Sequence, residues 1–342
     1  MKIFVFIIST LALGLIFSEE NKISRSEHVK AFNEAQRCFN STSIRQLEKK
    51  LHCSKRALER GRFLFEPESL NMAGLTFNYG KTLHRRDSLK SYEVLSRSLE
   101  LYEVIYGKNA PEIIHVLIEM GKSSRTLSIA KKNFTQTSSE YAGVLLKLSM
   151  SDKFTLLQTL SFASSAYQLY LQEEGVESYN TAVASFQMGK IKFVQKKYKS
   201  AIPYLIGGTE HPDVASFSHG WLVRAYGLTD QDDLASYHAQ QLGLLRQGQV
   251  DDEFIPVFEP NANYPQFAQR RDVEGYAVIE LTISKEGSAT DVVLIEESPE
   301  SWGFGEEALK AGARLLYAPR FVNGEALEVP GVLYKYSFKM AN

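Results

Sequence analysis

The amino-acid sequence predicts a multidomain protein in which an all-α array of helical repeats precedes a small α+β domain. Between residues 27 and 246 the chain consists of short amphipathic segments with few prolines and little of the alternation that indicates strands. After residue 256 it changes to alternating apolar and polar runs separated by glycine and proline turns. We therefore expect an apolar leader at 1–18, a helical domain at 25–247 and an α+β domain at 253–342.

The leader has the pattern of a signal peptide. Met1-Lys2 is followed by an apolar run from Ile3 to Phe17, and charge begins at Glu19. The run is shorter than the roughly 20 residues that a spanning helix needs, and Ser18 supplies a small residue for cleavage. We therefore expect export. The alternative is a retained amino-terminal anchor, since the bulky Ile16 fits poorly in a small-x-small cleavage site.

Two cysteines, Cys38 and Cys53, lie 15 residues apart in helical segments. An exported chain meets an oxidising compartment, so we expect them to form a disulfide between two antiparallel helices. Two buried free thiols remain the alternative, because the spacing alone does not fix the geometry. Neither cysteine has a second one close by, so the pattern does not favour a zinc site.

The helical region contains an internal repeat. Three segments end in Gly-Lys, and their glycines are Gly80, Gly121 and Gly189, at spacings of 121 − 80 = 41 and 189 − 121 = 68 residues. The second spacing is two units of about 34 residues, the tetratricopeptide period. We expect these glycines where neighbouring helices approach closely. The segment 98–112 resembles long-loop tetratricopeptide repeats, in which one helix ends at a glycine, here Gly107, and the next opens near a proline, here Pro111.

Stacked repeats of this kind bury apolar faces that single units cannot bury. The resulting surface commonly binds peptides or other proteins. The sequence therefore predicts a scaffolding region. It leaves open whether the region recognises a ligand or only holds the last domain in place.

The last domain begins with a strand at 276–284, whose alternation predicts one buried face formed by Ala277, Ile279, Leu281 and Ile283. A second strand is predicted at 291–296. A helix follows, with apolar positions from Phe304 to Leu315, and we expect Pro319 to stop it shortly after Tyr317. A closing strand is predicted at 332–339.

The turn residues of this region occur in a specific order. They are a Tyr-Pro pair, a glycine before the first strand, a proline after the helix, and an Asn-Gly turn before an aromatic last strand: Tyr264, Pro265, Gly275, Pro319, Asn323 and Gly324. Their order and spacing resemble the carboxy-terminal domain of the TonB energy transducers. The whole chain is thus expected to be a tetratricopeptide-like array followed by a small α+β TonB C-terminal domain.

The resemblance implies a location and a binding mode. In the TonB family this domain lies in the periplasm and engages a short peptide of an outer-membrane transporter, which adds to a sheet edge. The strand at 332–339 would be that edge, with Tyr334, Tyr336 and Phe338 facing the helix. The residues expected to contact a partner are Leu333, Lys335, Ser337 and Lys339.

The chain also departs from the family pattern. Energy transducers retain an amino-terminal membrane helix that contacts motor proteins, and usually have a proline-rich spacer, whereas this chain has 10 prolines and no such spacer. Our first hypothesis is therefore a periplasmic, non-enzymatic interaction protein linked to outer-membrane transport. The alternatives are a membrane-anchored transducer that contacts inner-membrane motor proteins, and a cell-envelope enzyme whose site is formed by residues distant in sequence.

No catalytic, cofactor or metal motif is evident. The 7 histidines are scattered without an HExxH pattern. Glu296 and Glu297 are adjacent, and we expect them to be solvated at the end of a strand. The 39 basic and 40 acidic residues nearly cancel, which gives no electrostatic basis for binding nucleic acid.

Overall fold

The computed structural model describes residues 24–43, 45–247 and 254–340. The predicted leader lies outside the described residues. None of the helices in these ranges combines the length and the hydropathy that crossing a bilayer requires. Contacts divide the chain into two compact units, 1–129 and 130–342.

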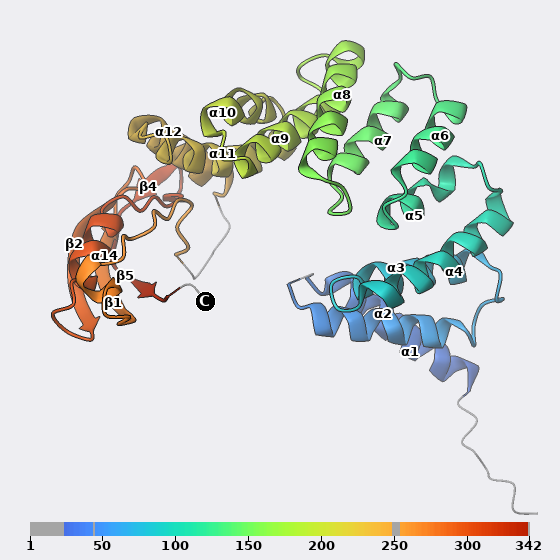
Figure 1. Cartoon of the computed structure of the whole chain (residues 1–342), viewed down its shortest axis with the longest axis horizontal. Helices are drawn as coiled ribbons and strands as arrows, with labels where there is room; N and C mark the ends of the chain where they lie inside the picture. Colours follow the sequence, from blue (N-terminus) through green and yellow to red (C-terminus); the bar gives the residue numbers. More distant parts are fainter. Residues whose placement is uncertain (1–23, 44, 248–253, 341–342) are drawn as a thin grey trace, which may run out of the picture. The chain divides into compact units, whose positions relative to one another are not determined.

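The first unit is helical (Figure 1). Its helices are α1 (Arg25–Ser41), α2 (Leu47–Gly61), α3 (Leu70–Leu83), α4 (Ser88–Tyr106), the 3-10 turn η1 (Pro111–Ile113), α5 (Ile114–Glu119) and the beginning of α6 (Ser123–Asn133). Helices consecutive in the chain pack on one another from α1 to α4.

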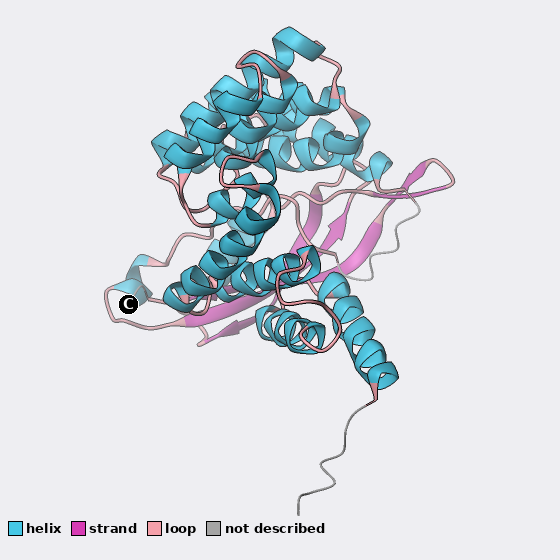
Figure 2. Cartoon of the chain, turned by 90° about the vertical axis from the view of Figure 1, so that its right-hand side faces the viewer, coloured by secondary structure: helices cyan, strands magenta, loops and turns pink. Residues whose placement is uncertain are grey.

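The second unit continues with helices and ends in strands, which are magenta in Figure 2. Its helices are α7 (Ser139–Ser149), α8 (Leu156–Glu174), α9 (Tyr179–Val194), α10 (Tyr198–Gly207), η2 (Gly208–Glu210), α11 (Pro212–Gly227), α12 (Asp232–Leu245), α13 (Gln266–Gln269) and α14 (Phe304–Gly312). Its strands are β1 (Gly275–Ile283), β2 (Ala289–Ser298), β3 (Arg320–Val322), β4 (Glu325–Leu327) and β5 (Val329–Phe338). The predicted fold class is confirmed. The predicted domain limits, 25–247 and 253–342, stay a prediction.

Side-chain caps and glycines define where the repeat helices begin and end. Ser24 and Thr155 each form a capping box at the start of α1 and α8. Gly107 (φ 93°) and Gly175 (φ 84°) end α4 and α8 in a conformation that glycine adopts readily. Since Pro111 opens η1 four residues after Gly107, the predicted long-loop geometry is confirmed.

Two of the three repeat glycines pack as predicted. A Cβ atom on Gly80 would lie 2.9 Å from Cγ of Leu95, and one on Gly189 would lie 2.7 Å from Cγ of Leu205. These distances are too short for real side chains, so each glycine permits close contact between the helices of one pair, α3 with α4 and α9 with α10.

The prediction for Gly121 is wrong. Gly121 has a φ of 72° and follows α5. Its N–H donates to the Ile118 carbonyl, and the Lys122 N–H donates to the Leu117 carbonyl, both at 2.9 Å. This is a helix C-terminal glycine motif. The sequence Gly-Lys is therefore used at Gly121 to end a helix, not to bring two helices together.

Cys38 of α1 and Cys53 of α2 are disulfide-bonded, with their Cα atoms 5.8 Å apart. The Cys53 side chain is buried. The bond closes a segment of 15 residues and joins the first helix to the rest of its unit. Such a cross-link restricts the unfolded chain, and it is typical of proteins folded in oxidising compartments.

The carboxy-terminal core has the predicted faces. The residues of the first strand that alternation assigned to the interior are all buried, at 2% exposure or less: Ala277, Ile279, Leu281 and Ile283. They pack against α14, whose predicted apolar positions Phe304 and Ala308 belong to the same core, as does Leu315, which follows the helix.

The predicted end of the last helix is wrong. Helix α14 ends at Gly312, before Tyr317 and Pro319. The following residues instead join the sheet layer: Leu316 exchanges backbone hydrogen bonds with Phe258, and the Tyr317 N–H donates to the Gly287 carbonyl at 2.7 Å. These partners are distant in sequence, so local periodicity did not reveal the change.

The carboxy-terminal domain packs directly on α11 and α12. Phe258 and Leu316 share one hydrophobic core with residues of α10 and α11, including Leu205, Leu222 and Val223. The backbone next to Phe258 is also bound to the helix: the Arg224 side chain of α11 donates to the Val257 carbonyl at 2.8 Å.

A second polar contact lies beside this core. The Arg314 guanidinium donates to the Gly227 carbonyl at 3.1 Å and to the Asp230 carboxylate at 3.0 Å. Apolar and polar contacts together therefore join the last helix pair to the sheet domain within one compact unit. We call this interface the α11 seam, defined by Arg224, Gly227, Phe258, Arg314 and Leu316.

Helices α11 and α12 also hold a histidine pair. Nδ1 of His219 and Nδ1 of His238 are 2.9 Å apart, so one ring donates a hydrogen bond to the other. His238 is 8% exposed and stacks on Tyr226. Burial, followed by the effect of His219, lowers the pKa of His238 to about 4, and burial also lowers the pKa of His219.

We expect the second unit to lose stability in acid through His238. Because its pKa falls from 6.5 to about 4 on folding, the unfolded state binds the proton more readily, and stability present above pH 6.5 declines as the pH falls toward 4. The expected loss between pH 8 and pH 5 is about 2 kcal/mol. Urea unfolding followed by tryptophan fluorescence measures it, since both tryptophans, Trp221 and Trp302, lie in this unit.

The variant His238→Gln retains a polar side chain that does not titrate, and it should flatten the pH profile. His52→Gln, at an exposed histidine of the first unit, is the matched control and should leave the profile unchanged. An equally steep loss in His238→Gln would show that another group is responsible.

Candidate functional site

The sheet of the last domain has an open edge. Its strand order is β2-β1-β5, with both neighbours antiparallel to β1. Strand β5 therefore pairs on one side only within the described residues. Such an edge presents unpaired N–H and C=O groups to an incoming strand.

The two faces of β5 differ in exposure. Val332, Tyr336 and Phe338 are buried at 8%, 6% and 4%, and Tyr334 is half-buried. The residues expected to contact a partner are all exposed: Leu333, Lys335 and Ser337 lie on the other face of β5, and Lys339 follows its last residue. Leu333 is the most apolar of these and is 61% exposed. The arrangement provides a core-facing side and a side available for contact.

The hairpin geometry gives the direction of the β1 backbone. In the turn between β1 and β2, the Ser284 N–H donates to the Ser288 carbonyl at 2.9 Å, so the backbone of Ser284 points toward β2. Backbone groups of successive strand residues point to opposite sides. The N–H and C=O groups of Ile279 and Ala277, which are odd-numbered, therefore point toward β5.

The same alternation gives the direction of the β5 backbone. Ile279 pairs with Tyr334 and Ala277 with Tyr336, so the backbone groups of these two tyrosines point back to β1. We infer that the N–H groups of the intervening residues point outward, to the open edge. The outward residues are Leu333, Lys335 and Ser337. The same residues thus offer exposed side chains and free backbone groups.

A row of interacting side chains crosses the exposed face beside this edge. The Lys335 ammonium lies 3.6 Å from the centroid of the Tyr276 ring, and the Tyr276 hydroxyl donates to the Glu296 carboxylate at 2.5 Å. This hydrogen bond, and the negative charge of Glu296, raise the pKa of Tyr276. Lys335 is therefore held against the sheet by a cation–π contact.

On the opposite face, tyrosines of β5 lie near Glu259. Burial and the interaction with Glu259 raise the pKa values of Tyr334 and Tyr336, and they raise that of Tyr317 to about 12. The hydroxyls of Tyr317 and Tyr336 are buried without a hydrogen-bond partner among the described residues. All three phenols are thus neutral at physiological pH.

The predicted turn residues occupy defined positions. The Tyr264 hydroxyl donates to the Val273 carbonyl at 2.8 Å, and its ring packs on Phe304. Pro265 precedes α13. A Cβ atom on Gly275 would collide with the Phe304 ring, so the start of β1 requires glycine. These residues shape the domain and lie outside the β5 edge.

The remaining turn residues form the short hairpin β3/β4. Asn323 (φ 52°) and Gly324 (φ 85°) both adopt the left-handed conformation that a tight two-residue hairpin requires. Pro319 lies before β3, and its carbonyl oxygen would be 2.5 Å from a Cβ atom on Gly243 of α12. This hairpin therefore lies beside the last helix of the array.

Glu297 is not solvated as expected. Its carboxylate accepts hydrogen bonds from the N–H groups of Trp302, Gly303 and Gly305 at 3.1, 3.3 and 2.9 Å. It therefore satisfies the free donors at the start of α14, where a negative charge is favoured. Since Glu296 is engaged by Tyr276, the two carboxylates act separately, not as a pair.

The described residues contain no cluster of three His, Cys, Asp or Glu side chains that could hold a metal ion. Sequence reasoning missed two features near the edge. The cation–π contact of Lys335 required the pairing register of β1 and β5, and the capping role of Glu297 required knowledge of where α14 begins.

Comparison with known families confirms the resemblance of the last domain. Residues 260–340 match the family model described as "Gram-negative bacterial TonB protein C-terminal". No curated protein matches the chain.

Solved structures similar to the chain include BtubC (BKLC) from P. vanneervenii, with 12% identity and a TM-score of 0.40, covering 61% of this chain and 98% of that one. They also include a putative kinesin light chain with nearly identical TPR-like repeats from Podosopora anserina, with 10% identity and a TM-score of 0.34. That match covers 65% of this chain and 96% of the other.

Proposed function

We propose that this protein is a non-enzymatic interaction protein of the Gram-negative cell envelope, whose last domain binds an extended peptide by strand addition at β5. The match of residues 260–340 to the TonB C-terminal model supports the link to envelope transport. The observation that carries the binding mode is the open edge of β5, where Leu333, Lys335 and Ser337 combine exposed side chains with outward backbone groups.

The proposed partner is a periplasmic segment of an outer-membrane transporter. Backbone hydrogen bonds to β5 would supply affinity, and contacts with Leu333, Lys335, Ser337 and Lys339 would select the sequence. The helical repeats, joined to this domain through the α11 seam, would serve as its scaffold. The protein would act in the periplasm after export. Determining the mature amino terminus and the membrane association of the expressed protein separates this adaptor from an anchored transducer.

Nuclear magnetic resonance of the labelled full chain tests the binding mode. The probes are synthetic peptides matching the periplasmic amino-terminal segments of outer-membrane transporters from the same organism. We expect a binding peptide to shift the β5 amide resonances and to slow hydrogen exchange at Leu333, Lys335 and Ser337, because their N–H groups become paired.

A peptide with proline at alternate positions is the control, since proline cannot donate to a ladder. It should bind far more weakly. Shifts confined to surfaces other than β5, or equal binding by the proline-containing peptide, would contradict strand addition.

A further inference from the structure

A pairing of two extended segments joins the α11 seam to the sheet. The Phe258 N–H donates to the Leu316 carbonyl at 3.1 Å, and the Leu316 N–H donates to the Phe258 carbonyl at 3.1 Å. The Val257 N–H also donates to the Leu316 carbonyl, at 2.7 Å. We call this pairing the connecting ladder, defined by Val257, Phe258, Glu259, Leu316 and Tyr317.

Neighbouring residues of the connecting ladder face opposite cores. Phe258 and Leu316 belong to the core that they share with α10 and α11. Tyr317, which directly follows Leu316, is 1% exposed and belongs to the sheet core, together with Val332 and Tyr336 of β5. Side chains of an extended segment alternate between its two faces. One backbone segment therefore packs on the helical array with one face and on β5 with the other.

Glu259 continues this alternation in the other segment of the ladder. It directly follows Phe258 and lies near the tyrosines on the core-facing side of β5. Burial, followed by a hydrogen bond to Glu259, raises the pKa of Tyr334. Burial, followed by the charge of Glu259, raises the pKa of Tyr336. Both segments of the ladder thus reach the face of β5 that carries Tyr334 and Tyr336.

We propose that the connecting ladder couples the helical array to the β5 edge, so that the packing of α11 on the ladder sets the affinity of β5 for its peptide. A ladder fixed by α11 holds Tyr334 and Tyr336 against the sheet, and the outward N–H groups of β5 then keep one line. When the ladder is loosened, β5 spends less time in the conformation that pairs with a peptide, and the apparent affinity falls by that fraction. The coupling rests on the proposed strand addition only for its effect on affinity.

The seam has two polar contacts that can be removed without changing either core. The Arg224 side chain donates to the Val257 carbonyl of the ladder at 2.8 Å. Arg314, two residues before Leu316, donates to the Gly227 carbonyl of α11 at 3.1 Å. Both arginines are exposed, so the double variant Arg224→Gln/Arg314→Gln should remain folded. It should loosen the ladder, because hydrogen bonds from charged donors are the stronger ones.

Hydrogen exchange of the labelled full chain without peptide is the first measurement. The amides of Tyr334 and Tyr336 pair with β1 and report how firmly β5 is held. In the double variant these amides should exchange about threefold to tenfold faster, as expected for the loss of two hydrogen bonds. The amides of α8, in the same unit, should keep their rates.

Calorimetry with the transporter peptides is the second measurement. The double variant should bind about threefold to tenfold more weakly than the unsubstituted protein. Coupling of this kind is reciprocal, so a bound peptide should slow exchange of the Leu316 amide in the unsubstituted protein.

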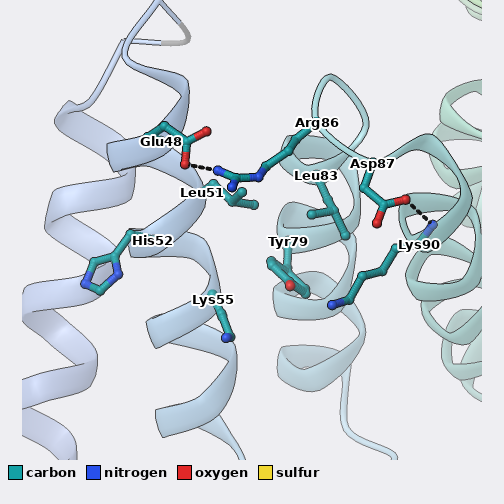
Figure 3. Close-up of a pocket in the computed structure, with 9 residues that line it drawn as sticks. All are labelled: Glu48, Leu51, His52, Lys55, Tyr79, Leu83, Arg86, Asp87 and Lys90. Atoms are coloured by element: carbon teal, nitrogen blue, oxygen red, sulfur yellow. Dashed lines mark hydrogen bonds and ion pairs between the residues drawn. The ribbon is translucent and has the colours of Figure 1, made fainter.

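Two further arginine variants are the matched controls. Arg246→Gln makes the same change at an exposed position directly after α12. Arg86→Gln removes the ion pair with Glu48, which lies beside the groove of the first unit shown in Figure 3. Neither control should change exchange or affinity at β5 by more than about twofold, because neither residue contacts the ladder.

The outcomes separate the coupling from the proposed function. Unchanged exchange at Tyr334 and Tyr336 in the double variant, or equal acceleration throughout the second unit, would overturn the coupling. Faster exchange at these amides with unchanged peptide affinity would show that the ladder does not set affinity. Faster exchange in a protein that binds none of the transporter peptides would support the coupling and count against strand addition instead.

Discussion

Replacing Lys335 by proline is expected to weaken peptide addition at β5 strongly and to leave the domain folded. The Lys335 N–H points to the open edge, so proline removes a donor for the partner and places its ring where the incoming strand must lie. The backbone groups that pair β5 with β1 belong to Tyr334 and Tyr336 and are retained. Edge strands tolerate proline at positions whose N–H faces solvent.

The expected loss of affinity comes mainly from the partner carbonyl that stays unpaired, about 1–3 kcal/mol, or about fivefold to more than a hundredfold. Lys335→Ala is the matched control: it removes the same side chain and its contact with Tyr276 but keeps the N–H. Affinities are measured with the transporter peptides by calorimetry, and circular dichroism checks the fold. Equal affinities for the proline and alanine variants would rule out backbone pairing at this position.

Local sequence patterns predicted those parts of the fold in which residues at regular spacing have the same surroundings. Alternation assigned Ala277, Ile279, Leu281 and Ile283 correctly to the buried face, because α14 covers that side of β1. The same argument assigned Leu333 and Lys335 to the exposed face. The candidate edge was therefore predictable as a set of residues.

Other features depend on contacts between distant residues and were not predictable. Gly121 and Gly189 share one Gly-Lys pattern, yet Gly121 ends a helix with a positive φ and Gly189 packs under Leu205. The early end of α14 depends on the pairing of Leu316 with Phe258.

The α11 seam joins the last helix pair to the sheet domain, and its Gly227 leaves no room for a side chain. A Cβ atom there would lie 2.8–3.0 Å from three atoms of the Phe258 ring, which is 4% exposed in the shared core. Gly227→Ala should therefore destabilise the second unit by about 2–3 kcal/mol through overpacking. For a unit of 342 − 129 = 213 residues, this lowers Tm by about 4–12 °C.

Gly220→Ala is the matched control in the same helix, because the nearest side-chain atom to its added Cβ would be 3.8 Å away, an ordinary contact. It should stabilise the helix by up to about 1 kcal/mol. Thermal unfolding is followed by the fluorescence of Trp221 and Trp302. If the seam joins the array to the sheet domain, both tryptophans should report one transition in the unsubstituted protein.

Phe258→Leu provides the decisive comparison, since the smaller side chain makes room for the new methyl group. If the ring of Phe258 causes the loss, Gly227→Ala should cost less in the Phe258→Leu background, with a coupling energy of about 0.5–3 kcal/mol. Strict additivity would show that Gly227 and Phe258 act independently. The destabilisation by Gly227→Ala would then come from contacts other than the Phe258 ring.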